Sequence, residues 1–219
     1  MRRGLRSLYW RLVRFGFRLL YNEMAFTYDS VSWVVSLGEW RTWQRAAIKH
    51  LGVPPRALVL ELAHGTAALQ IDLRAAGLDS VAIDFSPYMG RIARRRLLNL
   101  HIPPKLARAR AQALPFAEGV FPAVVSTFPT DFIVDPATIA EVYRILEPGG
   151  RLVFVPNGIL TRGGAARQVL DSAYRATGQR SPWPVSIEAV FGAAGFSVSQ
   201  TIEEGKRSMA QVVIAQKPG

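Results

Sequence analysis

The strongest constraint on the fold is the order of patterns in residues 57–90. Two apolar runs lie there. The first ends at Glu61, and the second ends at Asp84, about twenty residues beyond a turn of small residues at 63–67. Strand, tight turn, helix, strand and acid, in this order, are typical of a nucleotide-binding βαβ unit. In such units the turn brings the backbone close to the ligand, and the second acid accepts hydrogen bonds from ribose hydroxyls. By itself, the pattern leaves open which nucleotide is bound.

Several ordered segments narrow that choice. They are LELAHGTA (60–67), AIDFSPYM (82–89), AQALPFAEGVFPAVVSTF (111–128) and EVYRILEPGGRLVFV (141–155). Together with Tyr28–Asp29, these segments resemble the class I S-adenosylmethionine-dependent methyltransferases in order and separation. The resemblance is to the branch that includes the ubiquinone and menaquinone biosynthesis methyltransferases, and it covers roughly residues 21–160. It implies S-adenosyl-L-methionine as the cofactor.

Alternating strand and helix patterns predict an α/β protein with a doubly wound, mostly parallel sheet. The family resemblance implies a Rossmann-like methyltransferase fold with seven strands, the last of them antiparallel. We expect residues 1–50 to form an N-terminal helical cap or lid and residues 51–219 to form the methyltransferase domain. The expected strands are 57–62, 80–84, 105–110, 121–128, 150–156, 196–202 and 209–216, and the expected helices are 5–20, 38–50, 67–76, 88–99, 136–146 and 164–177.

The resemblance also implies a set of cofactor-binding residues. Glu61 would orient the methionine end and Asp84 would bind the ribose, although either side chain could instead serve a local hydrogen bond or helix cap. Tyr28 would close over the methyl donor. The turn residues would offer their backbone to the ligand, namely Ala63, His64, Gly65 and Thr66. The residues expected on the adenine side are Phe85, Met89, Ala111, Gln112 and Leu114, with a core position as the alternative for Met89.

The chain departs from the family pattern at the turn and near the adenine. Ala63 and Ala67 stand where the family has its first and third glycines, and only Gly65 matches. The third position tolerates alanine in the related dinucleotide motif, because its role there is close packing. Ala63 is the harder replacement, since a left-handed backbone penalises a Cβ by roughly 1 kcal/mol or more. Arg110 replaces an acid that many relatives carry, so adenine recognition there would fall to the backbone of the next residues.

Composition excludes several kinds of chemistry. The chain has no cysteine, which excludes disulfides, thiolate nucleophiles and cysteine-bound zinc. Its three histidines are scattered without metal-ligand spacing. No uncharged apolar run approaches the roughly 18 residues that span a bilayer, and arginine interrupts what would be the apolar region of a signal peptide. These features suit a cytoplasmic protein.

The formal net charge is +11, and arginine supplies most of it. A genome rich in arginine codons is one explanation, but residues 1–20 are locally extreme because they combine arginines with an apolar helical stripe and contain no acid. Such a helix can lie in an anionic membrane interface, which would make the protein peripheral at the membrane. It can also pack on the domain, act as a lid or contact a second subunit in a homodimer. Nucleic acid is the least supported partner, since the basic stretch at 91–110 lacks the interleaved aromatic side chains typical of single-strand binders.

We therefore expect a methyltransferase that acts on a small, hydrophobic, quinone- or lipid-like acceptor. The acceptor class rests on family analogy, the apolar N-terminal segment and the aromatic residues Phe128, Phe132 and Trp183. No catalytic base is assigned. His64 lies inside the turn motif but is expected to be packed or bonded to the backbone, and the sequence does not separate the substrate-side polar residues Thr130, Asp131 and Asn157. The alternative is a degenerate methyltransferase fold that serves as a binding or membrane-associated scaffold, for which the replacements at Ala63 and Arg110 are the argument.

Overall fold

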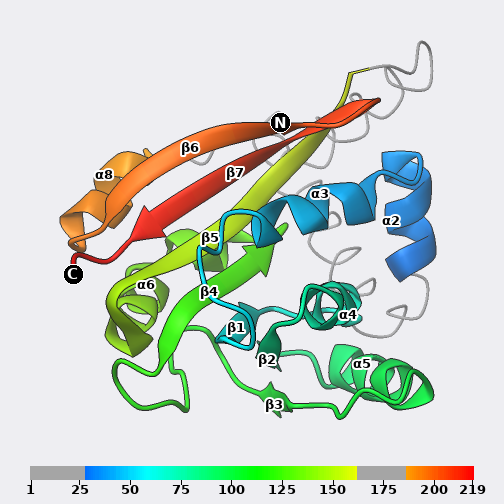
Figure 1. Ribbon diagram of the computed structural model, residues 1–219, viewed down its shortest axis with the longest axis horizontal. Helices are drawn as coiled ribbons and strands as arrows, with labels where there is room; N and C mark the ends of the chain where they lie inside the picture. Colours follow the sequence, from blue (N-terminus) through cyan, green and yellow to red (C-terminus); the bar gives the residue numbers. More distant parts are fainter. Residues whose placement is uncertain (1–27, 162–185) are drawn as a thin grey trace, which may run out of the picture.

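A seven-stranded sheet with the strand order β3-β2-β1-β4-β5-β7-β6 forms the centre of the molecule (Figure 1). The computed structural model describes residues 28–161 and 186–219. The pairs between β1, β2, β3, β4 and β5 are parallel, whereas β7 runs antiparallel to both of its neighbours. This is the doubly wound, mostly parallel arrangement expected from the sequence, with the antiparallel last strand that the family resemblance implied.

The strands are β1 (Leu58–Leu62), β2 (Asp79–Asp84), β3 (Leu106–Arg108), β4 (Phe121–Thr127), β5 (Leu146–Leu160), β6 (Ser197–Glu204) and β7 (Ser208–Gln216). The helices of the described ranges are α2 (Tyr28–Ser36), α3 (Trp40–Ile48), α4 (Ala68–Ala75), α5 (Pro87–Asn99), the 3-10 helix η2 (Asp131–Val134), α6 (Pro136–Ile145) and α8 (Ile187–Ala193).

Alternate side chains of the strands point to two separate hydrophobic cores. Leu60, Val124 and Phe154 face α6 and α8, whereas Val59, Val125 and Val153 face α3 and α4. Successive strand residues point to opposite faces, so a strand covered on both sides must be apolar throughout. In Figure 1, α3, α4 and α5 accordingly lie on the opposite face of the sheet from α6 and α8.

Helix α3 is seated on the sheet by a close contact between Trp43 and Gly158 of β5. Trp43 is among the largest fully buried side chains. A Cβ added at Gly158 would lie 2.0 Å from its ring, so only glycine leaves room for the indole. On the exposed side of the helix, Arg41 and Arg45 reach Asp72 of α4 at 2.6 and 2.9 Å. These contacts make α3 part of the helical layer over the sheet, although its residues fall within the expected cap.

Each expected helix or strand that falls on described residues corresponds to an observed element, although the bounds differ and some observed elements were not expected. Expected helix 38–50 corresponds to α3, while α2, η2 and α8 were not expected. Strand β5 begins at Leu146 rather than at residue 150, and a register irregularity lies beside this start. The expected helices 5–20 and 164–177 lie outside the described residues, as does Trp183. The proposed boundary between cap and domain at residue 50 stays a prediction.

Gly158→Ala should destabilise the protein by about 1–3 kcal/mol, because the new methyl group would force Trp43 out of its packed position. Chemical denaturation measures this change in the free energy of unfolding. Gly192→Ala is a matched control, since a Cβ there meets no atom within 4 Å and the residue lies in helix α8. Gly192→Ala should raise the free energy of unfolding by about 0.5–1 kcal/mol, because alanine has a higher helix propensity than glycine. Equal effects of the two substitutions would contradict the seating role of Gly158.

Candidate functional site

Three neighbouring strands, β1, β2 and β3, bring polar residues to the carboxyl edge of the sheet. Glu61 lies near the end of β1, Asp84 ends β2, and Arg108 ends β3 directly opposite Asp84 in the strand register. Ligands of open α/β sheets bind beyond the carboxyl ends of the strands. The structure therefore places the expected cofactor residues of β1 and β2 side by side at this edge.

The Asp84 carboxylate joins the turn after β1 to the start of α5. One of its oxygens, Oδ2, accepts a hydrogen bond from the Gly65 amide at 2.9 Å, and Oδ1 accepts from the Ser86 amide at 2.8 Å. Ser86 in turn caps α5 by accepting from the Met89 amide at 3.3 Å. A carboxylate oxygen has two lone pairs, so each oxygen of Asp84 can accept one further hydrogen bond from a ligand hydroxyl.

The turn residues at all three glycine positions of the family motif have left-handed backbones. The φ angles are 56° at Ala63, 52° at Gly65 and 63° at Ala67. Ala63 is exposed, whereas Ala67 is fully buried against Ala93 and Leu97 of α5. The packing role expected at Ala67 is therefore present, but the backbone strain expected only at Ala63 occurs at both alanines.

Glu61 is a buried acid held by a short chain of hydrogen bonds. The residue is only 2% exposed. Gln70 of α4 donates to its Oε2 at 2.6 Å, and Ser80 of β2 donates to the Gln70 oxygen at 2.7 Å. Burial raises the pKa of Glu61 from 4.5 to about 8; the Gln70 bond opposes this shift and the nearby Asp84 and Asp72 reinforce it. Without a ligand, Glu61 is therefore protonated at neutral pH. Sequence reasoning did not identify Gln70 as a partner of Glu61.

His64 is buried within the turn and bonded to the backbone. Its Nδ1 lies 2.9 Å from the Gly65 carbonyl oxygen, so Nδ1 carries the hydrogen and donates it. Burial lowers the pKa of His64, against the opposing effect of Asp84. The side chain is thus a neutral, packed turn histidine, which is the role expected for it.

On the side of β3, Phe85 presents an exposed ring beside two arginines. The ring is 52% exposed. The guanidinium carbons lie over it, that of Arg110 at 4.4 Å and that of Arg108 at 5.4 Å from the centroid. Of the other residues expected near the adenine, Ala111, Leu114 and Met89 are buried, and Gln112 is half-buried with its amide bound to Asp135 at 3.0 Å. The burial of Met89 favours the core alternative for this residue.

Helix α2 is tied to the turn by Asp29. Thr66 donates to Asp29 Oδ1 at 2.6 Å, and Arg96 of α5 lies 2.6 Å from Asp29 Oδ2. Arg96 also reaches the Thr66 hydroxyl at 3.2 Å. The predicted cap thus contacts the predicted cofactor turn through one carboxylate. Tyr28 begins α2, but its side chain lies outside the described residues.

An aromatic wall lies beyond the end of β4 and consists of Trp40, Trp43 and Phe128. The rings of Trp40 and Phe128 stack with their centroids 3.8 Å apart, and Trp43 meets Phe128 edge-on at 6.1 Å. Beside the wall, Gln44 donates to Thr127 at 3.1 Å, while Gln44 Oε1 is buried with no hydrogen-bond partner among the described residues. Sequence reasoning named Phe128 but missed the residues of α3, whose tryptophans were the available signal.

The other substrate-side candidates do not form a common cluster in the described part of the chain. Thr130 and Asp131 are exposed around η2, and Phe132 is partly buried against the core. Asn157 donates to Gln211 of β7 at 3.0 Å. No group of three or more metal-binding side chains occurs within the described residues. Because the polar candidates do not meet at one point, a catalytic base stays unassigned.

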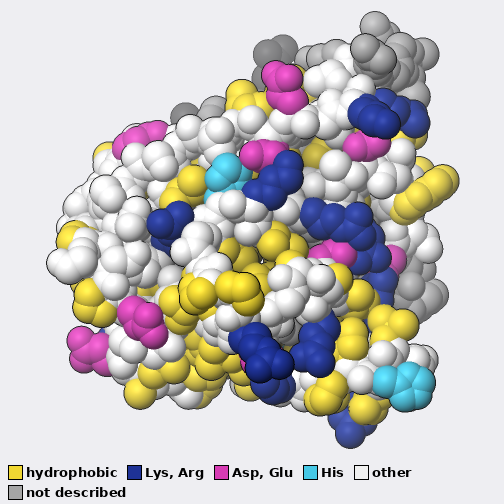
Figure 2. Space-filling view, in the orientation of Figure 1, with side chains coloured by type: hydrophobic (Ala, Val, Ile, Leu, Met, Phe, Trp, Pro, Cys, Tyr) yellow, Lys and Arg dark blue, Asp and Glu magenta, His cyan; other side chains and the backbone are white. Residues whose placement is uncertain are grey.

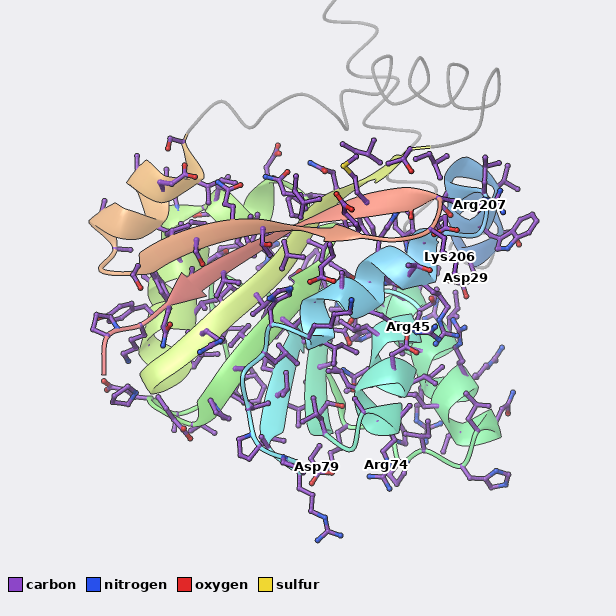
Figure 3. All side chains as sticks on the ribbon, turned by 45° about the horizontal axis from the view of Figure 1, so that its top comes forward. Asp29, Arg45, Arg74, Asp79, Lys206 and Arg207 are labelled. Atoms are coloured by element: carbon purple, nitrogen blue, oxygen red, sulfur yellow. The ribbon has the colours of Figure 1, made fainter. Side chains whose placement is uncertain are left out.

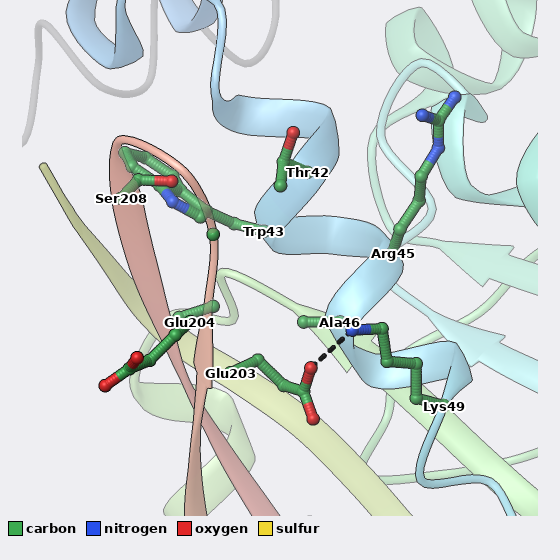
Figure 4. Close-up of a pocket in the computed structure, with 10 residues that line it drawn as sticks. Thr42, Trp43, Arg45, Ala46, Lys49, Glu203, Glu204 and Ser208 are labelled. Atoms are coloured by element: carbon green, nitrogen blue, oxygen red, sulfur yellow. Dashed lines mark hydrogen bonds and ion pairs between the residues drawn. The ribbon is translucent and has the colours of Figure 1, made fainter.

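A separate hollow of about 230 Å³ lies between α3 and the β6–β7 hairpin (Figure 4). Across it, Lys49, directly after α3, donates to Glu203 of β6 at 2.5 Å. Among the described residues expected to bind the cofactor, none lines this hollow. It is distinct from the strand-end site.

Comparison with known proteins identifies the family of this chain. The sequence model of the ubiE/COQ5 methyltransferase family matches residues 16–175 of this chain. The chain belongs to this family. It is therefore an S-adenosylmethionine-dependent methyltransferase, as the motifs predicted, and the comparisons give no support to the non-catalytic scaffold.

Relatives and solved structures agree with this assignment. A demethylmenaquinone methyltransferase of Thermus thermophilus is 33% identical over 82% of this chain and 92% of its own length. A demethylmenaquinone methyltransferase of Mycolicibacterium vanbaalenii is 40% identical over 61% of this chain, and the match spans little more than half of that protein (57%). The solved structure of phosphoethanolamine N-methyltransferase 2 of Haemonchus contortus, which contains S-adenosylhomocysteine, has a TM-score of 0.61 to this chain. The two are 15% identical, and the match covers 83% of this chain and 53% of that chain. This last similarity shows the common fold.

Ala63→Gly should stabilise the methyltransferase by up to about 1 kcal/mol, because the relief of a left-handed alanine outweighs the added freedom of glycine in the unfolded chain. Ala67→Gly is the matched comparison. It relieves a similar backbone strain but also removes a buried methyl group, which is worth about 0.8 kcal/mol. In thermal and denaturant unfolding, Ala63→Gly should therefore be the more stable of the two variants. The reverse order would show that the turn at Ala63 is not strained.

Glu61→Gln should stabilise the ligand-free methyltransferase at alkaline pH and weaken cofactor binding. In the unfolded chain Glu61 ionises above pH 4.5, whereas in the folded chain it holds its proton to about pH 8. Its contribution to stability is therefore fully present below pH 4.5 and is lost as the pH rises to about 8. Glutamine keeps the bond to Gln70 without a charge, so the stability advantage of the variant should grow across this interval.

Calorimetric melting between pH 5 and 9 tests this expectation, and titration with S-adenosylmethionine measures the loss of affinity. A constant difference in stability between the two proteins over this range would contradict a buried, protonated Glu61.

Proposed function

We propose that this methyltransferase methylates a ring carbon of a demethylmenaquinone-type naphthoquinone in its reduced form. The observation that carries this proposal is the stacked pair of Trp40 and Phe128 at the end of β4. The chain is also 33% identical to a demethylmenaquinone methyltransferase over 92% of the length of that protein. Stacked aromatic side chains favour a flat aromatic ligand, because offset ring stacking adds to the burial of apolar surface.

The same proposal places the cofactor across the strand ends. Glu61 of β1 would face the methionine end and Asp84 of β2 would face the ribose. Phe85, directly after β2, would face the base. Two observations support this placement. Asp84 keeps one lone pair on each oxygen for a ribose hydroxyl, and the buried carboxyl of Glu61 gains a partner for its charged form when an ammonium group approaches.

Reduction of the acceptor is required by its chemistry. The bound cofactor supplies an electrophilic methyl group on a sulfonium. A quinone ring is electron-poor, whereas a hydroquinone that loses a hydroxyl proton directs an electron pair onto its ring carbon. After that carbon has gained the methyl group, it would release its own hydrogen as a proton, which restores the aromatic ring. The chain would hold that carbon in line with the methyl group and exclude water, and such positioning can supply much of the rate. Gln44 Oε1, beside the aromatic wall, would accept a hydrogen bond from a ring hydroxyl.

The surface near the cap supports access from a membrane. Trp33 and Val34 of α2 are exposed by 64% and 58%. Lys206 and Arg207 lie at the tip of the β6–β7 hairpin beside α2 (Figure 3). Tryptophan and basic side chains together favour an anionic interface, where a lipid-tailed quinone resides. We include peripheral binding to such a surface in the proposal, with residues 1–20 as the expected anchor.

Two surface observations bear on the other partners. On the face shown in Figure 2, Lys and Arg side chains form separate clusters among Asp and Glu, with no continuous basic track. Within the described residues, no helix has the length and apolar character that a bilayer span requires. A homodimer stays a prediction.

Two tryptophan substitutions separate acceptor binding from membrane binding. Trp40→Leu should lower kcat/KM about two- to tenfold with any naphthoquinol, since an aromatic pair is worth about 0.5–1.5 kcal/mol. Trp33→Ser should leave turnover of a short-chain, water-soluble naphthoquinol unchanged and reduce turnover of a long-chain acceptor in anionic vesicles. Methyl transfer from labelled S-adenosylmethionine measures both.

Ile202→Ser provides the control for Trp33→Ser, because Ile202 is similarly exposed but lies on the edge strand β6. If a reduced naphthoquinol accepts no methyl group under these conditions, the acceptor class is wrong. If Trp33→Ser and Ile202→Ser behave alike in vesicles, the membrane surface is wrong and the acceptor class stands.

A further inference from the structure

The order of the strand ends shows where the base of the cofactor would lie. The methionine end is assigned to β1 and the ribose to β2, so the nucleoside extends toward β3, the next strand at the edge of the sheet. The first side chains that it meets there belong to Phe85, Arg108 and Arg110. This inference rests on the proposed placement of the cofactor along the strand ends.

Arg108 and Arg110 surround Phe85 as a compact group. Arg108 Nε donates to the Phe85 carbonyl oxygen at 3.1 Å and so is fixed at the strand end. Arg110 makes the closer approach to the ring, with its guanidinium carbon 4.4 Å from the centroid. A guanidinium over an aromatic ring is attracted by the ring's negative face. The exposed Phe85 ring thus holds Arg110 where the proposed placement of the cofactor puts the base.

Hydrogen-bond donors dominate this part of the site. Arginine has five N–H donors and no acceptor. Each of the nearby acceptors is engaged in one hydrogen bond: the Phe85 carbonyl accepts from Arg108, the Arg110 carbonyl from the Ala113 amide at 3.1 Å, and the two Asp135 oxygens from Gln112 and the Ala137 amide at 3.0 Å each. The 6-amino group of adenine is a donor, whereas the 6-oxo group of hypoxanthine is an acceptor.

We propose that Arg110 is a specificity-determining residue of the cofactor site and makes the base subsite tolerant of a 6-oxopurine. Arg110 pairs with acceptor atoms on the base edge and gives the 6-amino group of adenine no advantage. The enzyme therefore recognises its cofactor mainly by the ribose and methionine ends, and it binds a nucleoside ligand with hypoxanthine about as well as one with adenine.

Titration calorimetry with S-adenosylhomocysteine and its 6-oxo analogue, S-inosylhomocysteine, tests this inference on the full chain. The native protein should bind the two ligands with dissociation constants within about threefold. Arg110→Asp replaces the donors by an acceptor and should prefer the adenine ligand by about tenfold or more, the factor expected from one hydrogen bond gained and one mismatch introduced. Arg110→Gln offers both a donor and an acceptor and should lie between them.

Arg94→Asp is the matched control for charge. It makes the same change on an exposed position of α5 and should keep the native ratio of affinities. Melting temperatures of all variants verify that they are folded. A native preference for adenine of about tenfold or more, or a ratio that Arg110→Asp leaves unchanged, would overturn the inference.

Asp84→Ala distinguishes failure of the base subsite from failure of the cofactor placement. Because both ligands carry the same ribose, this substitution should weaken both by the same factor. If it weakens neither, the placement along the strand ends fails and the inference fails with it. If it weakens both while the native protein prefers adenine strongly, only the role of Arg110 is wrong.

Discussion

The double hydrogen bond of the Asp84 carboxylate holds the ligand-binding edge together. One oxygen binds the amide of the turn after β1 and the other binds the amide that begins the N-terminus of α5. The carboxylate thus fixes the distance between two strand ends whose loops would otherwise be independent. Each bond is charge-assisted, which makes it roughly twice as strong as a neutral one. The position of Thr66, and through it the contact with α2, depends on this anchor.

The two acids at the strand ends have opposite electrostatic surroundings and so suit different tasks. Glu61 is buried behind the turn, where desolvation keeps it protonated until about pH 8. Asp84 is half-buried and receives two amide hydrogen bonds. A positively charged ligand group beside Glu61 removes the reason for its protonation, so binding of such a group and release of a proton are linked.

Sequence patterns predicted the sheet and the strand-end residues because these follow from local rules. Apolar runs that end at Glu61 and Asp84 define two strands and place both acids at the same edge. The aromatic wall did not follow from local rules, since Trp40 and Phe128 are far apart in the chain and meet only when α3 packs on β5. Gln70 was missed for the same reason, because its partner Glu61 lies on another element. Ala67 is packed as expected and is also left-handed, a backbone strain that was expected only at Ala63, so one residue can satisfy two constraints that a motif treats as one.

The alanines of the turn also bear on how often the site is ready to bind. Left-handed backbone is unfavourable for alanine by roughly 1–2 kcal/mol per residue, and both Ala63 and Ala67 adopt it. This penalty narrows the energy gap between the conformation that Asp84 holds and its competitors, and any population that moves to a competitor is lost to binding. The apparent dissociation constant of any ligand rises in proportion to the missing population. Product as well as cofactor would be held more loosely, which shortens the time that the demethylated cofactor occupies the enzyme between turnovers.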